Sequence, residues 1–458
     1  MKKFVDVHPD DHHYFINADG STYLPIGCNI CFFRNSHKVS NETVRETYRK
    51  WFTSFAANGG NYVRIWLGVP FFDCMPEKPG VYDEQILDNI RFVIKLGEEL
   101  GIKIKFTFEH FRRIGKGKDI EAYNGVASFD KELYCGIVNN MDEYLDSEYC
   151  RQIYLDRARK FAELGFGDSP AVICWELWNE INCIAHIDKL EPWCNYMISE
   201  LQKIFPKQMI VSNIGSFSLP SGYMLYDHLA RLPEQPFLQV HRYMDPGAEI
   251  EACLGPMDVL CFDSIRELRD RNNDCPLFLA EVGATEANHS CYSHMYKIDS
   301  KGTLLHDEIF APFFAGSAGT GQPWHWDYIY IDQHDLWYHF GIFKKALEGI
   351  DPAAEKFVPF HTSTPRLRVY GLRGKNTILY WCRDKESNWQ YELIDGKEPQ
   401  LISGEEIPAE LAETEHLCYL PWEDRYETAV SSVRKHYGAT CVLPDFKRSI
   451  VVRVNRSK

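Results

Sequence analysis

The stretch that decides the fold of this 458-residue chain is Val172-Ile173-Cys174-Trp175-Glu176-Leu177-Trp178-Asn179-Glu180. Its first seven residues are apolar except for Glu176, which is typical of a short strand buried on both faces. Such strands belong to parallel sheets that are covered by helices. Because Glu180 follows the strand directly, we expect its carboxylate at the carboxyl edge of the sheet.

Similar apolar runs recur along the chain and alternate with amphipathic helices such as Asn41–Ala57 and Asp83–Leu100. This alternation predicts an α/β protein, a (β/α)8 TIM barrel. A hairpin at Phe15–Leu24, turning at Asp19-Gly20, is expected to close its bottom. The expected strands are Leu24–Ile30, Tyr62–Leu67, Ile102–Phe108, Val172–Trp178, Met209–Asn213, Phe237–His241, Leu277–Glu281 and a less regular one at Phe313–Trp324.

The composition changes after Asp351-Pro352 to short β-prone runs without helical periodicity. We expect a catalytic barrel with its N-terminal hairpin over residues 1–353, and a small C-terminal antiparallel β-sandwich domain over 354–458. We expect the sandwich to brace the barrel or to carry a binding site of its own. Its expected strands are Leu367–Leu372, Thr377–Cys382, Gln390–Ile394, His416–Leu420 and Ser449–Val454.

The formal net charge of −15 disfavours nucleic acid and anionic lipid as partners. The polar segment Met1–Asp11 does not resemble a signal peptide, and no apolar run reaches the roughly 18 residues of a membrane span. We therefore expect a cytoplasmic protein whose 15 scattered cysteines are reduced. Cys28 and Cys31 form a CxxC pair without a second pair at zinc spacing, so no metal or cofactor is expected. The oligomeric state has no signal in the sequence.

Two carboxylates stand at matched places in this barrel. Glu180 ends the fourth strand and Glu281 the seventh, and their separation of 281 − 180 = 101 residues equals about three βα units of roughly 31 residues. Strands four and seven lie across the barrel from each other, so the two side chains can converge over one cavity. A pair of carboxyl groups is what glycoside hydrolysis requires, one to protonate the leaving oxygen and one to attack the anomeric carbon.

Trp178-Asn179-Glu180 after one strand, with Glu281-Val282-Gly283 ending another, resembles clan A of the glycoside hydrolases, and within it the cellulase-like family five. The likeness covers about residues 15 to 350. It implies a retaining β-glycosidase in which Glu180 is the general acid/base and Glu281 the nucleophile.

Further positions match the pattern of that family. The resemblance implies that Arg64 keeps the nucleophile ionised, that Asn179 binds the 2-hydroxyl of the sugar, and that Tyr243, in His241-Arg242-Tyr243, donates to the nucleophile. His241 belongs to the same motif. Arg64 should lower the pKa of Glu281, and the charge of Glu281 should raise that of Glu180, so that the two pKa values move apart.

Three more residues are expected at the sugar site by the same resemblance. His110 ends the third strand and matches a rim histidine, although it would fit an interior position as well. Trp324 matches the tryptophan that floors the site, and Trp326 is the alternative. Glu176 shares strand parity with Glu180, and we interpret it as a buried structural partner of Arg64.

The expected function is hydrolysis of a β-linked oligosaccharide or small glycoside through a covalent glycosyl-enzyme. Exo action and a β-mannoside or β-glucoside are favoured, and the rim segment Glu121–Phe129 should influence the choice of sugar. The alternatives are β-galactosidase-type specificity, a carbohydrate-binding barrel without turnover, and a metal-dependent hydrolase. The last would need His-x-His after the first strand, where the chain has Cys28-Asn29-Ile30.

Overall fold

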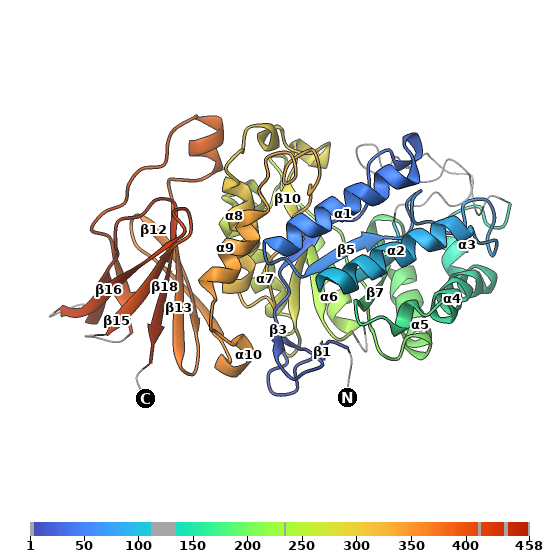
Figure 1. Cartoon of the computed structure of the whole chain (residues 1–458), viewed down its shortest axis with the longest axis horizontal. Coiled ribbons are helices and arrows are strands. Elements are labelled where there is room, and N and C mark those ends of the chain that lie inside the picture. Colours follow the sequence, from blue (N-terminus) through green and yellow to red (C-terminus); the bar gives the residue numbers. More distant parts are fainter. Residues whose placement is uncertain are drawn as a thin grey trace.

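The computed structural model describes residues 4–110, 134, 136–232, 235–410, 414–434 and 438–456. Seven parallel strands surround the larger core (Figure 1): β4 (Gly27–Asn29), β5 (Tyr62–Trp66), β6 (Lys103–Glu109), β7 (Val172–Trp178), β8 (Met209–Val211), β9 (Leu238–Met244) and β10 (Leu277–Ala284). Single bridges complete the ring. Ile214, which follows β8, forms a bridge with Val240 of β9. Pro323 forms a bridge with Val282 of β10, and its carbonyl accepts from the Asn29 amide of β4 at 3.1 Å. The predicted barrel is confirmed.

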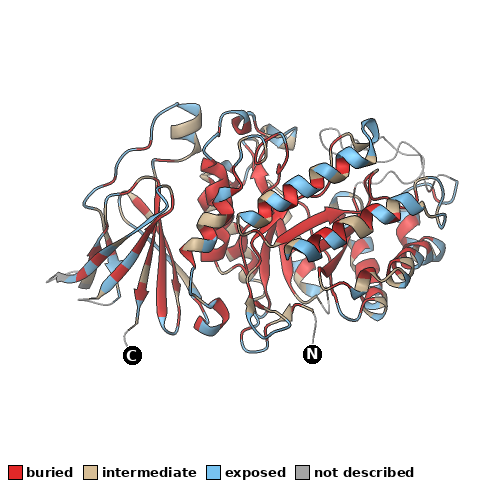
Figure 2. Cartoon of the chain, in the orientation of Figure 1, coloured by how far each residue is buried: buried red, intermediate tan, exposed pale blue. Residues whose placement is uncertain are grey.

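Helices wrap the strands with their apolar faces inward and their polar faces exposed (Figure 2). Side-chain caps fix their starts, as where Ser40 accepts from the Thr43 amide and Asp83 from the Gln85 amide. None of the described helices is both long and apolar enough to cross a bilayer. They are α1 (Asn41–Ala57), α2 (Glu84–Leu100), α3 (Met141–Asp146), α4 (Glu148–Glu163), α5 (Ile187–Ile204), α6 (Met224–Arg231), α7 (Met257–Arg269), α8 (Thr303–Phe314), α9 (Tyr338–Ala346) and α10 (Pro352–Glu355).

The eighth strand is the part of the barrel where the prediction is wrong. Phe313 belongs to the end of α8, so the expected run Phe313–Trp324 begins in a helix. Its later part does lie along β10, since the amides of Ala318, Gln322 and Trp324 donate to carbonyls of that strand, but in this run only Pro323 forms a bridge. Every residue of α8 is buried, so the helix lacks the polar stripe by which a sequence reveals helical periodicity. The predicted rim segment Glu121–Phe129 lies outside the described residues.

The N-terminal hairpin lies beneath the barrel, as expected. Strands β1 (Asp6–Val7), β2 (Phe15–Ile16) and β3 (Thr22–Tyr23) pair antiparallel, and Gly20 in the turn has a φ of 91°. The Phe15 ring stacks on Phe278 with centroids 5.6 Å apart. The apolar bottom of the barrel is therefore sealed from solvent.

The C-terminal strands form one curled antiparallel sheet in the order β11-β12-β13-β18-β15-β16-β17-β14. Its halves enclose a core of their own that includes Leu367, Ile407 and Phe446, which matches the expected sandwich. The boundary near residue 354 stays a prediction. The strands are β11 (Val358–Ser363), β12 (Leu367–Arg373), β13 (Thr377–Asp384), β14 (Glu406–Ala409), β15 (Glu415–Leu420), β16 (Arg425–Arg434), β17 (Gly438–Val442) and β18 (Ser449–Asn455).

The predicted strand Gln390–Ile394 is wrong, because this segment is one turn of π-helix. The Asn388 side chain accepts from the Tyr391 amide and so starts the turn. Glu392 then forms an ion pair with Arg448 at 2.7 Å, while Leu393 packs against the barrel core. The polar and apolar residues alternate here because Glu392 and Leu393 meet different neighbours on two sides of one turn.

The sheet and the barrel share a buried interface at α7 and α8. Arg383 of β13 contacts both oxygens of Asp307 at 2.7 and 3.1 Å, and Arg368 of β12 binds Asp258 at 2.5 and 2.9 Å. Trp381 of β13 lies at the same interface, with its ring stacked on Phe310 of α8 at a centroid distance of 5.8 Å. The geometry supports bracing as one role of the sheet.

We expect Arg383→Met to lower the free energy of unfolding by about 3–5 kcal/mol, because it leaves the buried Asp307 charge without its partner. Lys203→Met, which removes an exposed ion pair with Glu200 on α5, should leave the free energy of unfolding nearly unchanged. Denaturant unfolding of both variants measures the difference. Equal stability losses in the two would contradict the bracing role.

Candidate active site

Glu180 and Glu281 lie at the carboxyl ends of β7 and β10, and each is 5% exposed. Glu180 adopts a left-handed backbone conformation with a φ of 49°, and its amide donates to the Asn213 side chain at 2.6 Å. One oxygen of each carboxyl group and one nitrogen of His241 all lie within 4.8 Å of one another. The two acidic side chains thus meet over one cavity, as the sequence predicts.

Glu281 is held by two donors. Arg64 Nη1 lies 2.9 Å from its Oε2, and the Tyr243 hydroxyl donates to its Oε1 at 2.5 Å. Both contacts stabilise the ionised carboxylate. The positions of Arg64 and Tyr243 therefore agree with the roles that the family resemblance implies for them.

Glu180 has weaker polar contacts than Glu281. Its Oε1 accepts from the Ser216 amide at 3.2 Å and lies 2.9 Å from His241 Nδ1. Burial lowers the pKa of His241 to about 4, against the opposing charge of Glu281. The imidazole is accordingly neutral at neutral pH and adds no positive charge that would draw the proton from Glu180.

Burial raises the pKa of both carboxyl groups. Arg64 and Tyr243 do act to lower the pKa of Glu281, as expected of Arg64, but the loss of hydration outweighs them, so the expected net decrease is corrected to an increase. The hydrogen-bond partners of the two carboxyl groups still differ. Glu281 has a cation and a hydroxyl donor as hydrogen-bond partners, whereas Glu180 has one backbone amide and the neutral His241 ring, so the partners of Glu281 are the ones that stabilise an ionised carboxylate.

Beneath the carboxyl pair lies a network of buried charges. Arg64 binds Glu176 through Nε at 2.9 Å and Nη2 at 2.5 Å, which confirms the predicted partnership, and Lys105 reaches the other Glu176 oxygen at 2.9 Å. Although burial raises the pKa of Glu176, Arg64 and Lys105 outweigh it and lower the pKa. Arg64 Nη2 also donates to the Asn179 side chain at 2.6 Å. Glu176 is thus a permanent anion with a structural role.

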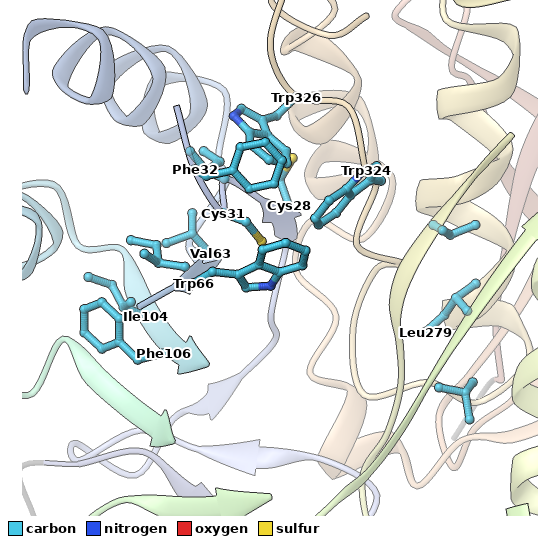
Figure 3. Close-up of a cluster of buried hydrophobic side chains, with 14 of the residues drawn as sticks. Cys28, Cys31, Phe32, Val63, Trp66, Ile104, Phe106, Leu279, Trp324 and Trp326 are labelled. Carbon is cyan, nitrogen blue, oxygen red and sulfur yellow. The ribbon is translucent and has the colours of Figure 1, made fainter. Parts of the chain in front are cut away.

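A small cavity, partly open to solvent, lies above the carboxyl groups. The indole rings of Trp66 and Trp324 form part of its wall. Their centroids lie 5.1 Å apart and their ring planes are inclined at 40° (Figure 3). Its lining residues are Trp66, Asn179, Glu180, Tyr243, Glu281, Thr285, His289, Cys291, Tyr292, Trp324 and His325.

Two predicted sugar-site residues lie behind this wall. Trp326 is fully buried and packs edge-on against Trp324 at 5.2 Å, so Trp324 is the ring that faces the cavity. His110 is buried and stacked on Trp66 at 5.1 Å, and it is not among the lining residues. Both support the wall from behind. Trp66 itself was missed, although it shares strand parity with Arg64 and could have been found from that spacing.

The remaining lining residues lie on loops that the sequence pattern does not reveal. Thr285, His289, Cys291 and Tyr292 follow β10, and His289 has a φ of 57°. His325 follows Trp324 with a φ of 67°. Irregular backbone of this kind has no hydrophobic period, so only the closed barrel shows which of these side chains reach the cavity.

Comparison with known proteins agrees with this geometry. No family model matches the chain. It is similar to mannan endo-1,4-β-mannosidase 1 of Solanum lycopersicum, with 23% identity over 64% of this chain and 80% of that protein. It is also 24% identical to mannan endo-1,4-β-mannosidase 3 of Arabidopsis thaliana over 43% of this chain, and the match spans about half of that relative, 49%.

Solved structures share the fold at low identity. The endo-β-1,4-mannanase of Thermotoga petrophila matches with a TM-score of 0.51 and 14% identity, covering 94% of this chain and 97% of that one. A family 5 glycoside hydrolase of Bacteroides vulgatus matches with a TM-score of 0.58 and 13% identity over 99% and 94% of the two chains. The predicted resemblance to family-five glycoside hydrolases is confirmed.

Glu180, His241 and Glu281 each offer one possible metal-ligand atom, and these atoms are close enough together to hold a cation. Arg64 and Tyr243 already bind Glu281, however. We therefore expect the melting temperature to be unchanged by dialysis against EDTA or by added Zn²⁺, because an ion would have to displace these bonds. A bound ion stabilises the folded state by mass action. A melting temperature that falls with EDTA and returns with zinc would contradict this expectation and favour the metal-dependent alternative.

Proposed function

We propose that this protein is a retaining β-glycoside hydrolase that removes mannosyl residues from the ends of β-linked oligosaccharides. The observation that carries the proposal is the meeting of two buried carboxyl groups with unlike partners, one bound by Arg64 and Tyr243 and the other by neither, beside a tryptophan-lined cavity.

The chemistry follows from these partners. Glu281, whose ionised form is stabilised by Arg64 and Tyr243, attacks the anomeric carbon, while Glu180 gives its proton to the leaving oxygen, so that the glycosidic bond breaks and a bond from Glu281 to the sugar forms. Water then enters, Glu180 takes its proton, and the bond to Glu281 is cleaved. Asn179, fixed by Arg64, is placed to bind the 2-hydroxyl of the sugar, a contact that strengthens in the transition state.

The separation of the carboxyl groups supports retention. Their nearest oxygens lie within 4.8 Å, which suits the retaining arrangement of roughly 5–5.5 Å better than the inverting one of about 6.5–9.5 Å. Inversion requires a water between the two carboxyl groups, and such a water needs the wider separation.

The sugar and the mode of action rest on different observations. The names of the relatives, mannan endo-1,4-β-mannosidases, support β-mannosides over β-glucosides and β-galactosides. Exo action is supported by the small size of the cavity, which the carboxyl pair, the Trp66 and Trp324 rings and the loop after β10 surround closely. The buried ion pair of Arg34 with Asp327, at 2.6 Å, also ties the loop after β4 to the segment that follows Trp324.

Glu281→Gln should lower the activity on at least one nitrophenyl β-glycoside by several orders of magnitude, because the amide cannot form the glycosyl ester. Glu286→Gln is the matched control, since Glu286 follows on the same loop but pairs with the exposed His294. A screen of nitrophenyl glycosides and short oligosaccharides measures both. Wild-type protein that binds these sugars without turnover would favour a carbohydrate-binding barrel instead.

Tyr243→Phe should move the acidic limb of the pH profile of kcat/KM to higher pH. The Tyr243 hydroxyl stabilises ionised Glu281, so its loss raises the pKa of the group that must be ionised to attack. The exposed Tyr149 on α4 provides the control, as Tyr149→Phe should leave both limbs in place. An unchanged acidic limb in Tyr243→Phe would argue against Glu281 as the nucleophile.

With mannopentaose labelled at its reducing end, we expect mannose and labelled mannotetraose as the first products, because the cavity accepts a chain end. Chromatography of samples taken below a tenth of full conversion identifies them. Labelled dimer and trimer at the earliest times, with a fast fall in the viscosity of soluble mannan, would establish internal cleavage.

A further inference from the structure

A loop after β10 carries a histidine to the wall of the cavity. Two consecutive residues, Asn288 and His289, have left-handed backbone with φ of 57°. Such conformations cost free energy outside glycine and persist where surrounding contacts impose them. The loop places the His289 ring edge-on over Tyr243, with centroids 4.7 Å apart.

The contacts that impose this conformation come from the end of β9. Asp245 accepts from the Asn288 amide and from the Gly247 amide, both at 2.8 Å. The Thr285 amide donates to the Met244 carbonyl at 2.8 Å, and the Glu286 amide to the Cys291 carbonyl at 2.9 Å. His289 is thus held at a fixed place on the rim, where the loop after β10 meets the end of β9.

His289 faces the acid side of the carboxyl pair. It lines the cavity together with Glu180, and the charges that act on its ring are those of Glu180 and Asp245. Because Glu180 protonates the glycosidic oxygen, a side chain beside it faces the leaving group. Burial lowers the pKa of His289, against the charges of Glu180 and Asp245, so the neutral ring offers one donor and one acceptor.

We propose that His289 binds a hydroxyl group of the leaving sugar and thereby makes the enzyme select glycosyl over aryl leaving groups. A hydroxyl group both donates and accepts, which matches a neutral imidazole. This inference rests on the proposed hydrolase function, in which Glu180 is the acid. Glu180, Glu281, Arg64 and His241 perform the chemistry, and His289 determines which leaving group is bound productively.

The test compares mannobiose with 4-nitrophenyl β-mannoside in wild type and in His289→Asn. Asparagine tolerates left-handed backbone, so the loop is retained while the side chain becomes too short to reach the substrate. We expect kcat/KM for mannobiose to fall by about tenfold or more, the effect of one lost hydrogen bond in a site built for it, and kcat/KM for the aryl mannoside by less than about threefold. His294→Asn on the same loop is the exposed control and should change neither.

A second measurement separates binding of the leaving sugar from a general structural effect. The glycosyl-enzyme formed from nitrophenyl mannoside can pass its mannosyl group to the hydroxyl of an added sugar, with Glu180 taking the proton and Glu281 released. His289→Asn should lower transfer to added mannose relative to hydrolysis, and should leave transfer to methanol unchanged.

The outcomes distinguish the two proposals. Wild-type protein that cleaves neither substrate would overturn the proposed mannosidase function, on which the role of His289 rests. Wild-type activity on both, with equal losses on the two substrates or no loss in His289→Asn, would overturn the role of His289 and leave the hydrolase function standing.

Discussion

The guanidinium group of Arg64 joins the interior of the barrel to the cavity above it. Its nitrogens donate to Glu176, Thr107, Asn179 and Glu281, and these four side chains come from three strands besides its own. A buried charge is tolerated only where it is paired and hydrogen-bonded, so each of these partners fixes the others. With Lys105 added, two cations face two carboxylates, Glu176 and Glu281, in a region closed to water. The position of the nucleophile is thus set by the packing of the barrel and not by the loop that follows it.

Residues of this network could be predicted from the sequence because they lie on regular strands. Arg64, Glu176 and Glu281 sit at fixed places in apolar runs, and the period of two in a strand tells which way each side chain points. The same holds for His241 and Tyr243, two residues apart on β9. The family resemblance added roles to positions that the pattern had already placed at one edge of the sheet.

The errors occurred where one local pattern could serve more than one environment. Helix α8 is buried on all sides, so its sequence reads as a continuous apolar run and Phe313 was assigned to a strand. In Gln390–Ile394 the alternation of a strand arises because Glu392 and Leu393 meet different neighbours on a π-turn. His289 reaches the cavity through contacts with Asp245, 44 residues earlier in the chain, which no local reading of the sequence contains.

The complete burial of α8 has a consequence for how this chain could have evolved. One side of the helix meets the barrel and the other meets β12 and the Trp381 ring, so the apolar core is continuous from the barrel into the sheet. Recombination that replaced the sheet with an unrelated one would leave an uncovered apolar helix on the barrel. Barrel and sheet are therefore expected to have been inherited as a single unit, with substitutions on one side matched by substitutions on the other.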